Sequence, residues 1–592
     1  MTFHNVSLPT LLLASTLLAA CNGSDNSSPA VTPPPARKAD VLLFRALCCE
    51  GQAYNNQKAQ LYKFNRLGET IQLSDPNETE YVESTMVSPD GERVAYGYRL
   101  INDELGVNIL HIDSARQEFS TAQLGGDYVR AITWRPDSQS LIYFTYTFES
   151  QNGTLSMARV SESSPLALME GVADYTASSD GALLATLSTS YESGRPIAAE
   201  LNLLDLTGQT EKVLLETTTE KANHFQVGWS PYGNELLYQA RFLDLDAYYT
   251  PADVPAGPLM LMDTDGSKRP VLDANPKYPS VVLSFSGLAA MPYRWLDEQR
   301  ILLNSSSAPS FLVIGRDGSV IVEQDIVYGS LIAPSPDQRH LAYINYDQGE
   351  RDNLKVYIMD LDTGDVQAVG QGSVLWLYNS VFDPSILRWS EDGSMLAWNS
   401  GISYDERSRG ELYVHNMETS ITELITSGYV HVEAQIQPYY QSAYRDQEGN
   451  FSWLPGENLL EYVTDSGDGL ELTMTDPTTN RTQAIGEMAA SVDTPCQYAR
   501  AWRSNEEVVW GHCGDGVYHS RIGNNGEVTS AKILNGEMFS AELTNNREYA
   551  AMRSGVAGDI GYWYVFDFVA DQVLKVELPE GSAQPSRVLL LQ

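Results

Sequence analysis

The sequence VSPDGERVAYGY, residues 87–98, combines a tight turn with a short apolar strand. Pro, Asp and Gly favour a reverse turn, and the following Val94-Ala95-Tyr96 is typical of a strand. The pattern returns, for example as WRPDSQSLIYFT (134–145), PSPDQRHLAYIN (334–345) and WSEDGSMLAWNS (389–400). Successive copies lie between 39 and 66 residues apart from Asp90 to Asn546. This period predicts a repeat protein built from one supersecondary unit.

Most copies are followed by a second apolar run and a polar hairpin, as in LMLMDTDGSKRPVL, residues 259–272. A four-stranded unit of this length predicts an all-β β-propeller blade. The segment containing residues 41–46, 59–65 and 69–74 resembles a further blade that lacks its first strand, which makes about eleven blades. Because one ring usually holds four to eight blades, we expect two rings, residues 40–330 with about six blades and 331–592 with about five. A seven-plus-four division fits nearly as well.

Six tryptophans occupy one position of the repeat, directly before the turn: Trp134, Trp229, Trp295, Trp389, Trp453 and Trp502. Other copies have Val87 and Leu543 in this position, which are apolar but lack an indole. A ligand site breaks the symmetry of a repeat, whereas a packing position recurs with it. We therefore interpret the tryptophans as structural residues buried between neighbouring blades, and not as a row that stacks on a ligand.

The turn-and-strand signature resembles the TolB-type propeller repeat of periplasmic proteins. This resemblance implies a binding or scaffold module that uses its loops and central channel to bind protein partners, including envelope lipoproteins. Two Tyr- and Pro-rich insertions, residues 241–258 and 428–450, are candidates for contact with a partner. Alternatively, they cover a blade edge or an interface between rings.

The N-terminal segment resembles a bacterial lipoprotein signal. Residues 11–20, LLLASTLLAA, are an apolar run of signal-peptide length, and Leu18-Ala19-Ala20-Cys21 resembles a lipobox. The resemblance implies a signal peptide over residues 1–20, lipidation of Cys21 and a flexible Ser-, Asn- and Pro-rich tether over residues 21–39. Asn22, in place of an Asp, favours the outer membrane, at its periplasmic face or at the cell surface. The alternative is an ordinary secretory signal.

Charge and motifs limit the function. The chain has 77 acidic and 38 basic residues and a net charge of −39, which argues against nucleic acid as a partner. The sequence lacks both the G-x-S-x-G and the H-E-x-x-H motif, and its eight histidines show no repeated ligand spacing. The acidic stretches 263–266 and 360–365 are read as hairpin turns and not as calcium loops. We expect no catalytic residue, metal or cofactor. The alternative is a glycan-active enzyme, a lyase or glycoside hydrolase, with scattered residues in the channel.

The cysteines fit an oxidising compartment. Cys496 and Cys513 lie 17 residues apart across the predicted strands of one blade, and we expect a disulfide between them. The adjacent Cys48 and Cys49 either form a vicinal disulfide or remain small side chains near a strand end.

Overall fold

The computed structural model divides the chain into two units, Met1–Ala39 and Asp40–Gln592. The residues that the structure describes all belong to the second unit. They are 40–48, 59–74, 79–100, 104–147, 152–160, 162–192, 195–206, 213–218, 224–233, 235–241, 256–273, 288–290, 293–305, 310–326, 332–347, 350–372, 387–400, 409–430, 451–465, 469–488, 498–512, 516–523, 525–544, 546–555, 562–577 and 582–590. These residues form strands and turns and contain no α-helix, and so none of them belongs to a helix that could cross a membrane.

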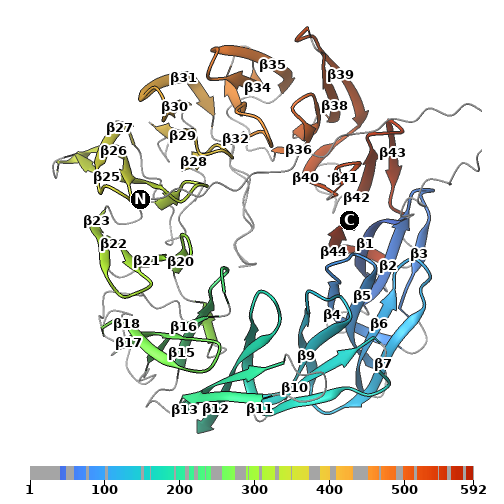
Figure 1. Ribbon diagram of the computed structural model, residues 1–592. Helices are drawn as coiled ribbons and strands as arrows, with labels where there is room; N and C mark the ends of the chain where they lie inside the picture. The colour runs from blue at the N-terminus through green and yellow to red at the C-terminus, as the bar shows by residue number, and fades with distance from the viewer. Residues whose placement is uncertain are drawn as a thin grey trace, which may run out of the picture. The chain divides into compact units, whose positions relative to one another are not determined.

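The strands group into blades, whose members are named in order from the inner to the outer strand (Figure 1). Blade 1 is β44 (Ser582–Leu590), β1 (Asp40–Cys48), β2 (Ala59–Asn65) and β3 (Thr70–Gln72); blade 2 is β4 (Thr79–Val87), β5 (Arg93–Leu100), β6 (Leu105–His111) and β7 (Gln117–Leu124). Blade 3 is β8 (Tyr128–Trp134), β9 (Ser140–Thr147), β10 (Asn152–Arg159) and the first half of β11 (Leu166–Ala177); blade 4 is the second half of β11, β12 (Leu183–Glu192), β13 (Arg195–Asp205) and β14 (Val213–Thr218). Blade 5 is β15 (His224–Trp229), β16 (Leu236–Arg241), β17 (Ala256–Met262) and β18 (Lys268–Leu272), with β19 (Leu288–Ala290) parallel to β15; blade 6 is β20 (Tyr293–Trp295), β21 (Arg300–Ser305), β22 (Ser310–Gly315) and β23 (Val320–Asp325).

Blade 7 is β24 (Ile332–Pro334), β25 (His340–Asp347), β26 (Glu350–Asp360) and β27 (Val366–Gln371); blade 8 is β28 (Leu387–Trp389), β29 (Met395–Ser400), β30 (Arg409–Asn416) and β31 (Ile421–Val430). Blade 9 is β32 (Phe451–Trp453), β33 (Leu460–Asp465), β34 (Leu470–Asp476) and β35 (Arg481–Met488); blade 10 is β36 (Tyr498–Ser504), β37 (Glu507–His512), β38 (Gly516–Ile522) and β39 (Val528–Leu534). Blade 11 is β40 (Glu537–Leu543), β41 (Tyr549–Gly555), β42 (Tyr562–Asp567) and β43 (Gln572–Lys575). Seven sheets are one blade each, and the sheets of seven and eight strands hold two blades each, which makes eleven. The all-β propeller architecture and the blade count agree with the sequence-based prediction.

The ends of this unit meet in blade 1. The segment that was predicted to lack a first strand receives β44 as its inner strand, antiparallel to β1, with Leu42 opposite Leu590 and Phe44 opposite Val588. The three outer strands, β1, β2 and β3, therefore come from one end of the unit, and the inner strand, β44, comes from the other. This pairing closes a propeller because it leaves no blade without its inner strand.

Apolar packing is continuous around the blades. Each of the eleven described core clusters joins two consecutive blades, and one of them joins blade 11 back to blade 1 through Phe44, Phe64, Tyr549 and Val565. Hydrophobic contact between neighbouring blades is thus what holds the ring together.

This continuity corrects the expected division into two rings. At residue 330, where we expected a boundary, Leu302 and Phe311 of blade 6 pack with Leu341 and Tyr343 of blade 7 in the same way as at the other junctions. Two separate rings would require blades 6 and 7 to lie apart, because each would have to pack against the other end of its own ring. The contact between these two blades excludes that arrangement. The described blades instead form one closed ring, and domains 40–330 and 331–592 are not separate.

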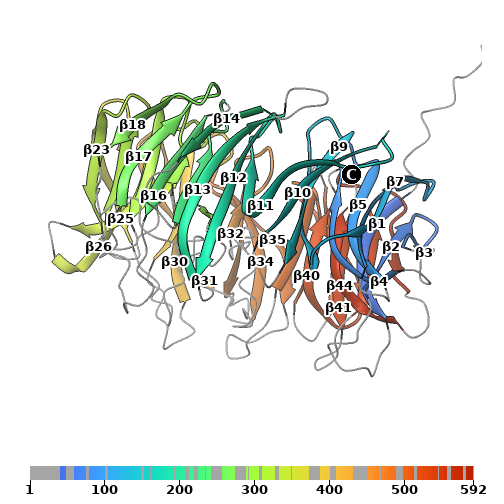
Figure 2. The same ribbon diagram turned by 90° about the horizontal axis from the view of Figure 1, so that it is seen from below.

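Strand β11 departs from the regular pattern because it serves two blades. Leu166 to Val172 pair with β10, and Val172 to Ala177 pair with β12, so the outer strand of blade 3 continues directly as the inner strand of blade 4. Gly171 at this crossing has a φ of +72°, which a glycine adopts without strain. Figure 2 shows β11 between β10 and β12.

The six repeated tryptophans pack between blades, as predicted from their position. Trp134, Trp295 and Trp502 are buried, and Trp229, Trp389 and Trp453 pack against the clusters shared with the preceding blade. Three indoles also donate a hydrogen bond to a backbone carbonyl of the preceding inner strand: Trp134 Nε1 to Met86 at 3.0 Å, Trp389 Nε1 to Ala333 at 2.8 Å and Trp453 Nε1 to Arg388 at 3.0 Å. The structural interpretation is therefore confirmed.

Candidate functional site

The repeated turn gathers polar groups whose role is to hold the turn closed. Ser88, Ser335 and Ser390 use their hydroxyl groups to accept the backbone N–H five residues later, at 2.9–3.0 Å. The Asp two residues after each Ser accepts the hydroxyl hydrogen. These serines and aspartates are therefore structural.

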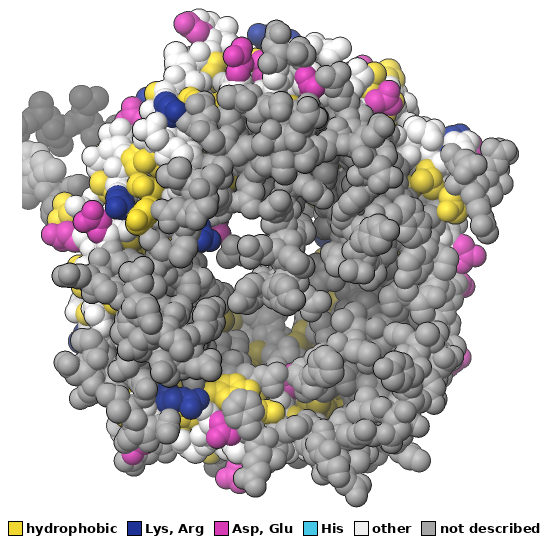
Figure 3. Space-filling model, turned by 180° about the vertical axis from the view of Figure 1, so that it is seen from behind, with side chains coloured by type: hydrophobic (Ala, Val, Ile, Leu, Met, Phe, Trp, Pro, Cys, Tyr) yellow, Lys and Arg dark blue, Asp and Glu magenta, His cyan; other side chains and the backbone are white. Residues whose placement is uncertain are grey.

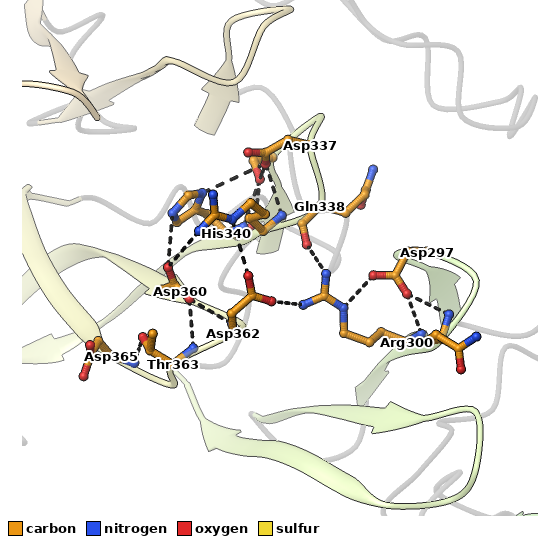
Figure 4. A network of polar contacts seen from close by, with 12 residues as sticks. Asp297, Arg300, Asp337, Gln338, His340, Asp360, Asp362, Thr363 and Asp365 are labelled. Atoms are coloured by element: carbon orange, nitrogen blue, oxygen red, sulfur yellow. Dashed lines mark hydrogen bonds and ion pairs between the residues drawn. The ribbon is translucent and has the colours of Figure 1, made fainter. Parts of the chain in front are cut away.

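Charged side chains of these turns connect neighbouring blades (Figure 4). Arg300 of blade 6 pairs with Asp297 at 2.6 Å, with Asp362 of blade 7 at 3.2 Å, and donates to the carbonyl of Gln338 at 3.0 Å. Burial favours the neutral form of Asp337, but its hydrogen bonds, led by that from the Ser335 hydroxyl, keep the pKa of this carboxyl below its ordinary value. These ion pairs and hydrogen bonds link blade 6 to blade 7.

The acidic hairpins are closed by hydrogen bonds within their own turns. The Gly266 N–H donates to the Asp263 carbonyl at 2.9 Å, and the Ser267 N–H donates to Asp265 at 2.8 Å, as in an ordinary turn. Asp360 accepts the backbone N–H groups of Asp362 and Thr363 in the same manner. No group of three or more metal-ligating side chains occurs among the described residues. Figure 3 shows Asp and Glu side chains of described residues scattered near the rim of one face.

A pocket of about 410 Å³ lies between blades 3 and 4, and we take it as a candidate ligand site. The end of β8 and the turn after it contribute Thr133, Trp134, Arg135 and Pro136, and β9 contributes Ile142. The second half of β11 and its turn contribute the remaining lining, Asp174, Tyr175, Thr176, Ala177, Ser178, Ser179 and Gly181. The volume is within the usual range for small-ligand sites, about 300–1,000 Å³.

Polar groups of the pocket are held in place by the two inner strands. The hydroxyl groups of Thr133 and Tyr175 are hydrogen-bonded at 2.9 Å, which connects β8 to β11 across the pocket. Burial raises the pKa of Tyr175, so this phenol stays neutral in neutral solution. The Tyr175 backbone N–H donates to the Asp174 carboxylate at 2.9 Å. The lining therefore offers several hydroxyl groups, one carboxylate and one guanidinium in a fixed arrangement.

The cysteines singled out in the sequence lie outside what the structure describes. Cys21, Cys49, Cys496 and Cys513 are outside the described ranges, and of Cys48 only the backbone position in β1 is described. The insertions 241–258 and 428–450 are also largely outside these ranges. The lipid anchor, the disulfide and the contact role of the insertions stay predictions.

Sequence reasoning missed the residues that line the pocket, apart from Trp134, which it interpreted as a packing residue. One signal for them was present, because Arg135 replaces the Ser of the S-P-D-G turn. Asp174 and Tyr175 carried no such signal, since they reach the pocket only through the crossing of β11 from one blade to the next.

Comparison with known proteins gives a fold likeness only. No family model and no curated protein matches the chain. Among solved structures, the β-propeller domain of the Trilobed protease from Pyrococcus furiosus is 12% identical, with a TM-score of 0.28, over 58% of this chain and 97% of that one. An oligogalacturonate lyase in complex with manganese is 13% identical, with a TM-score of 0.27, over 75% and 99%. A prolyl endopeptidase is 14% identical, with a TM-score of 0.30, over 64% of this chain and 55% of that one.

Proposed function

We propose that this chain is a lipid-anchored binding module of the bacterial envelope, in which the propeller holds a segment of a partner protein at the pocket between blades 3 and 4. The observation that carries the binding role is the pocket of about 410 Å³ with its preformed polar lining. The Thr133–Tyr175 hydrogen bond and the closed ring around it make this site rigid, which lowers the entropic cost of binding. The lipid anchor is inferred from Cys21 and the lipobox sequence that ends at this residue.

At this pocket, glycoside hydrolysis has less support than binding. Hydrolysis of a glycosidic bond uses two carboxyl groups that flank the bond. Among the described residues that line the pocket, Asp174 is the single carboxylate. The polar groups of this site therefore favour recognition of a ligand over glycoside hydrolysis.

The binding role is tested by filling the pocket. Thr176→Trp places a large side chain on β11 in the lining, and Thr529→Trp, on the exposed outer strand β39, is the matched control. Proteins from an envelope extract are crosslinked to each variant and quantified by mass spectrometry. We expect a partner that is retained by the wild type and by Thr529→Trp but lost from Thr176→Trp. The same set of proteins on all three would contradict a role for the pocket.

The anchor is tested separately. Cys21→Ser removes the thiol that carries the lipid, so the variant is expected to remain unprocessed or to appear in the soluble fraction. Metabolic labelling with palmitate followed by membrane fractionation gives the answer. Equal palmitate incorporation in the variant and the wild type would refute lipidation at Cys21.

A further inference from the structure

Arg135 breaks the pattern of the repeat at the pocket. Six of the ten copies have a Ser or Thr in its position: Ser88, Ser178, Ser230, Ser335, Ser390 and Thr544. The hydroxyl group of this residue accepts a backbone N–H of its own turn in each case. In blade 3 the turn is closed instead by Asp137, which accepts the N–H groups of Gln139 and Ser140 at 2.9 and 3.1 Å. The Arg135 side chain is thus not needed for the turn.

Arg135 is directed toward the neighbouring blade. A Cβ at Gly181, in the turn of blade 4, would lie 3.4 Å from Arg135 Cγ and 2.9 Å from Pro136 Cδ. The absence of a side chain at Gly181 therefore leaves room for the Arg135 stem beside the pocket. Ser178 and Ser179 of the same turn complete this side of the lining.

The Arg135 guanidinium lacks an anionic partner. Its Nε is buried without a hydrogen bond, and none of the ion pairs among the described residues includes it. Arg503, which occupies the same position in blade 10, pairs with Glu507 at 2.6 Å. The Arg135 guanidinium is thus partly withdrawn from water and unpaired, although the chain has 77 acidic residues. Such a group can bind an external anion.

We propose that the pocket recognises a carboxylate of the bound segment through Arg135, an inference that rests on the proposed binding function. Arg binds carboxylates with two parallel hydrogen bonds, and the Thr176 and Ser179 hydroxyl groups of the lining supply further donors. The planar guanidinium matches the two oxygens of a carboxylate, so a carboxylate suits this site. The carboxylate comes from an acidic side chain or from a chain terminus.

The test uses three pools of randomised N-acetylated hexapeptides without Asp or Glu elsewhere. One pool has a free terminal carboxylate, one is amidated, and one is amidated but has a central Glu. The immobilised full chain is equilibrated with each pool, and the retained peptides are quantified by mass spectrometry. We expect at least one carboxylate pool to be retained about tenfold more than the fully amidated pool, as a charge-assisted bidentate contact implies. Whichever carboxylate pool is enriched identifies the source.

Two variants separate recognition from folding. Arg135→Ser restores the residue that six other turns use, so it preserves the turn and removes the charge. It is expected to lose the preference for carboxylate, whereas Arg339→Gln, an exposed Arg in another turn, keeps it. If the three pools bind equally, and Arg135→Ser binds them like the wild type, the carboxylate inference is refuted but the proposed binding function is supported. If no pool binds, both proposals are overturned.

Discussion

Trp389 allows the contribution of the repeated indole to be divided into packing and hydrogen bonding. Its ring packs against the cluster shared by blades 7 and 8, and its Nε1 donates to the Ala333 carbonyl at 2.8 Å. Trp389→Phe keeps a large apolar ring but removes the donor. This hydrogen bond is partly buried, and its loss is expected to cost about 0.5–1.5 kcal/mol. Trp389→Ala also leaves a cavity and is expected to cost about 3–5 kcal/mol.

Trp502→Phe is the matched control. Trp502 occupies the same position in blade 10 and is buried, but its Nε1 has no hydrogen-bond partner. Replacing it by Phe removes an unpaired buried donor together with part of the ring, so the loss in stability should be smaller than for Trp389→Phe. The three substitutions are therefore expected to destabilise in the order Trp389→Ala, Trp389→Phe, Trp502→Phe.

Hydrogen exchange measured by mass spectrometry is the suitable assay, because a ring of eleven blades need not unfold in one step. Faster exchange in β24 and β28 of the Trp389 variants, with other blades unchanged, is the expected local effect. Urea unfolding followed by circular dichroism measures the change in the overall free energy of unfolding. The reasoning is refuted if Trp502→Phe costs as much as Trp389→Phe, or if both Trp389 variants exchange like the wild type.

Two further predictions concern blade 10. Cys496 and Cys513 are expected to form a disulfide, because their nearest described neighbours, Tyr498 and His512, are register partners on adjacent strands. Peptide mapping without reduction tests this bond. Two free thiols in oxidised protein would disprove it. Glu507 is expected to stabilise the fold in a pH-dependent way: burial opposes its charge, but hydrogen bonds, chiefly from Arg503, Arg521 and His519, lower its pKa below the ordinary 4.5. Its contribution is therefore fully present above pH 4.5 and is lost as the pH falls through the lower folded pKa. Urea unfolding of Glu507→Gln should show a deficit at pH 7 that shrinks at pH 3.5, and a constant deficit would contradict the assignment.

The blades could be predicted from sequence because their signals are local. Pro89, Asp90 and Gly91 determine a turn from their own backbone preferences, and Trp134 or Trp389 marks the end of an inner strand. The missing first strand of blade 1 was also visible, because the residues from Asp40 onward lack the turn that follows an inner strand. Local chemistry is enough to define each blade.

The number of rings and the pocket could not be predicted because they depend on contacts between blades. Leu302 and Tyr343 at the junction near residue 330 are the same kinds of residue as at every other junction, so the sequence carries no mark of continuity or of an end. The pocket requires Arg135 of one turn to lie beside Gly181 of the next. That neighbourhood follows from the path of β11, which no local pattern indicates.

The pairing of β44 with β1 determines when this protein can finish folding. A ribosome makes β1 first and β44 last, so blade 1 waits with an unpaired inner edge while the other ten blades are synthesised. Such an edge readily pairs with foreign strands, and it is covered only when the final strand arrives. A chain cut short before Ser582 keeps this edge open, which gives chaperones and proteases a structural means to recognise chains that lack β44.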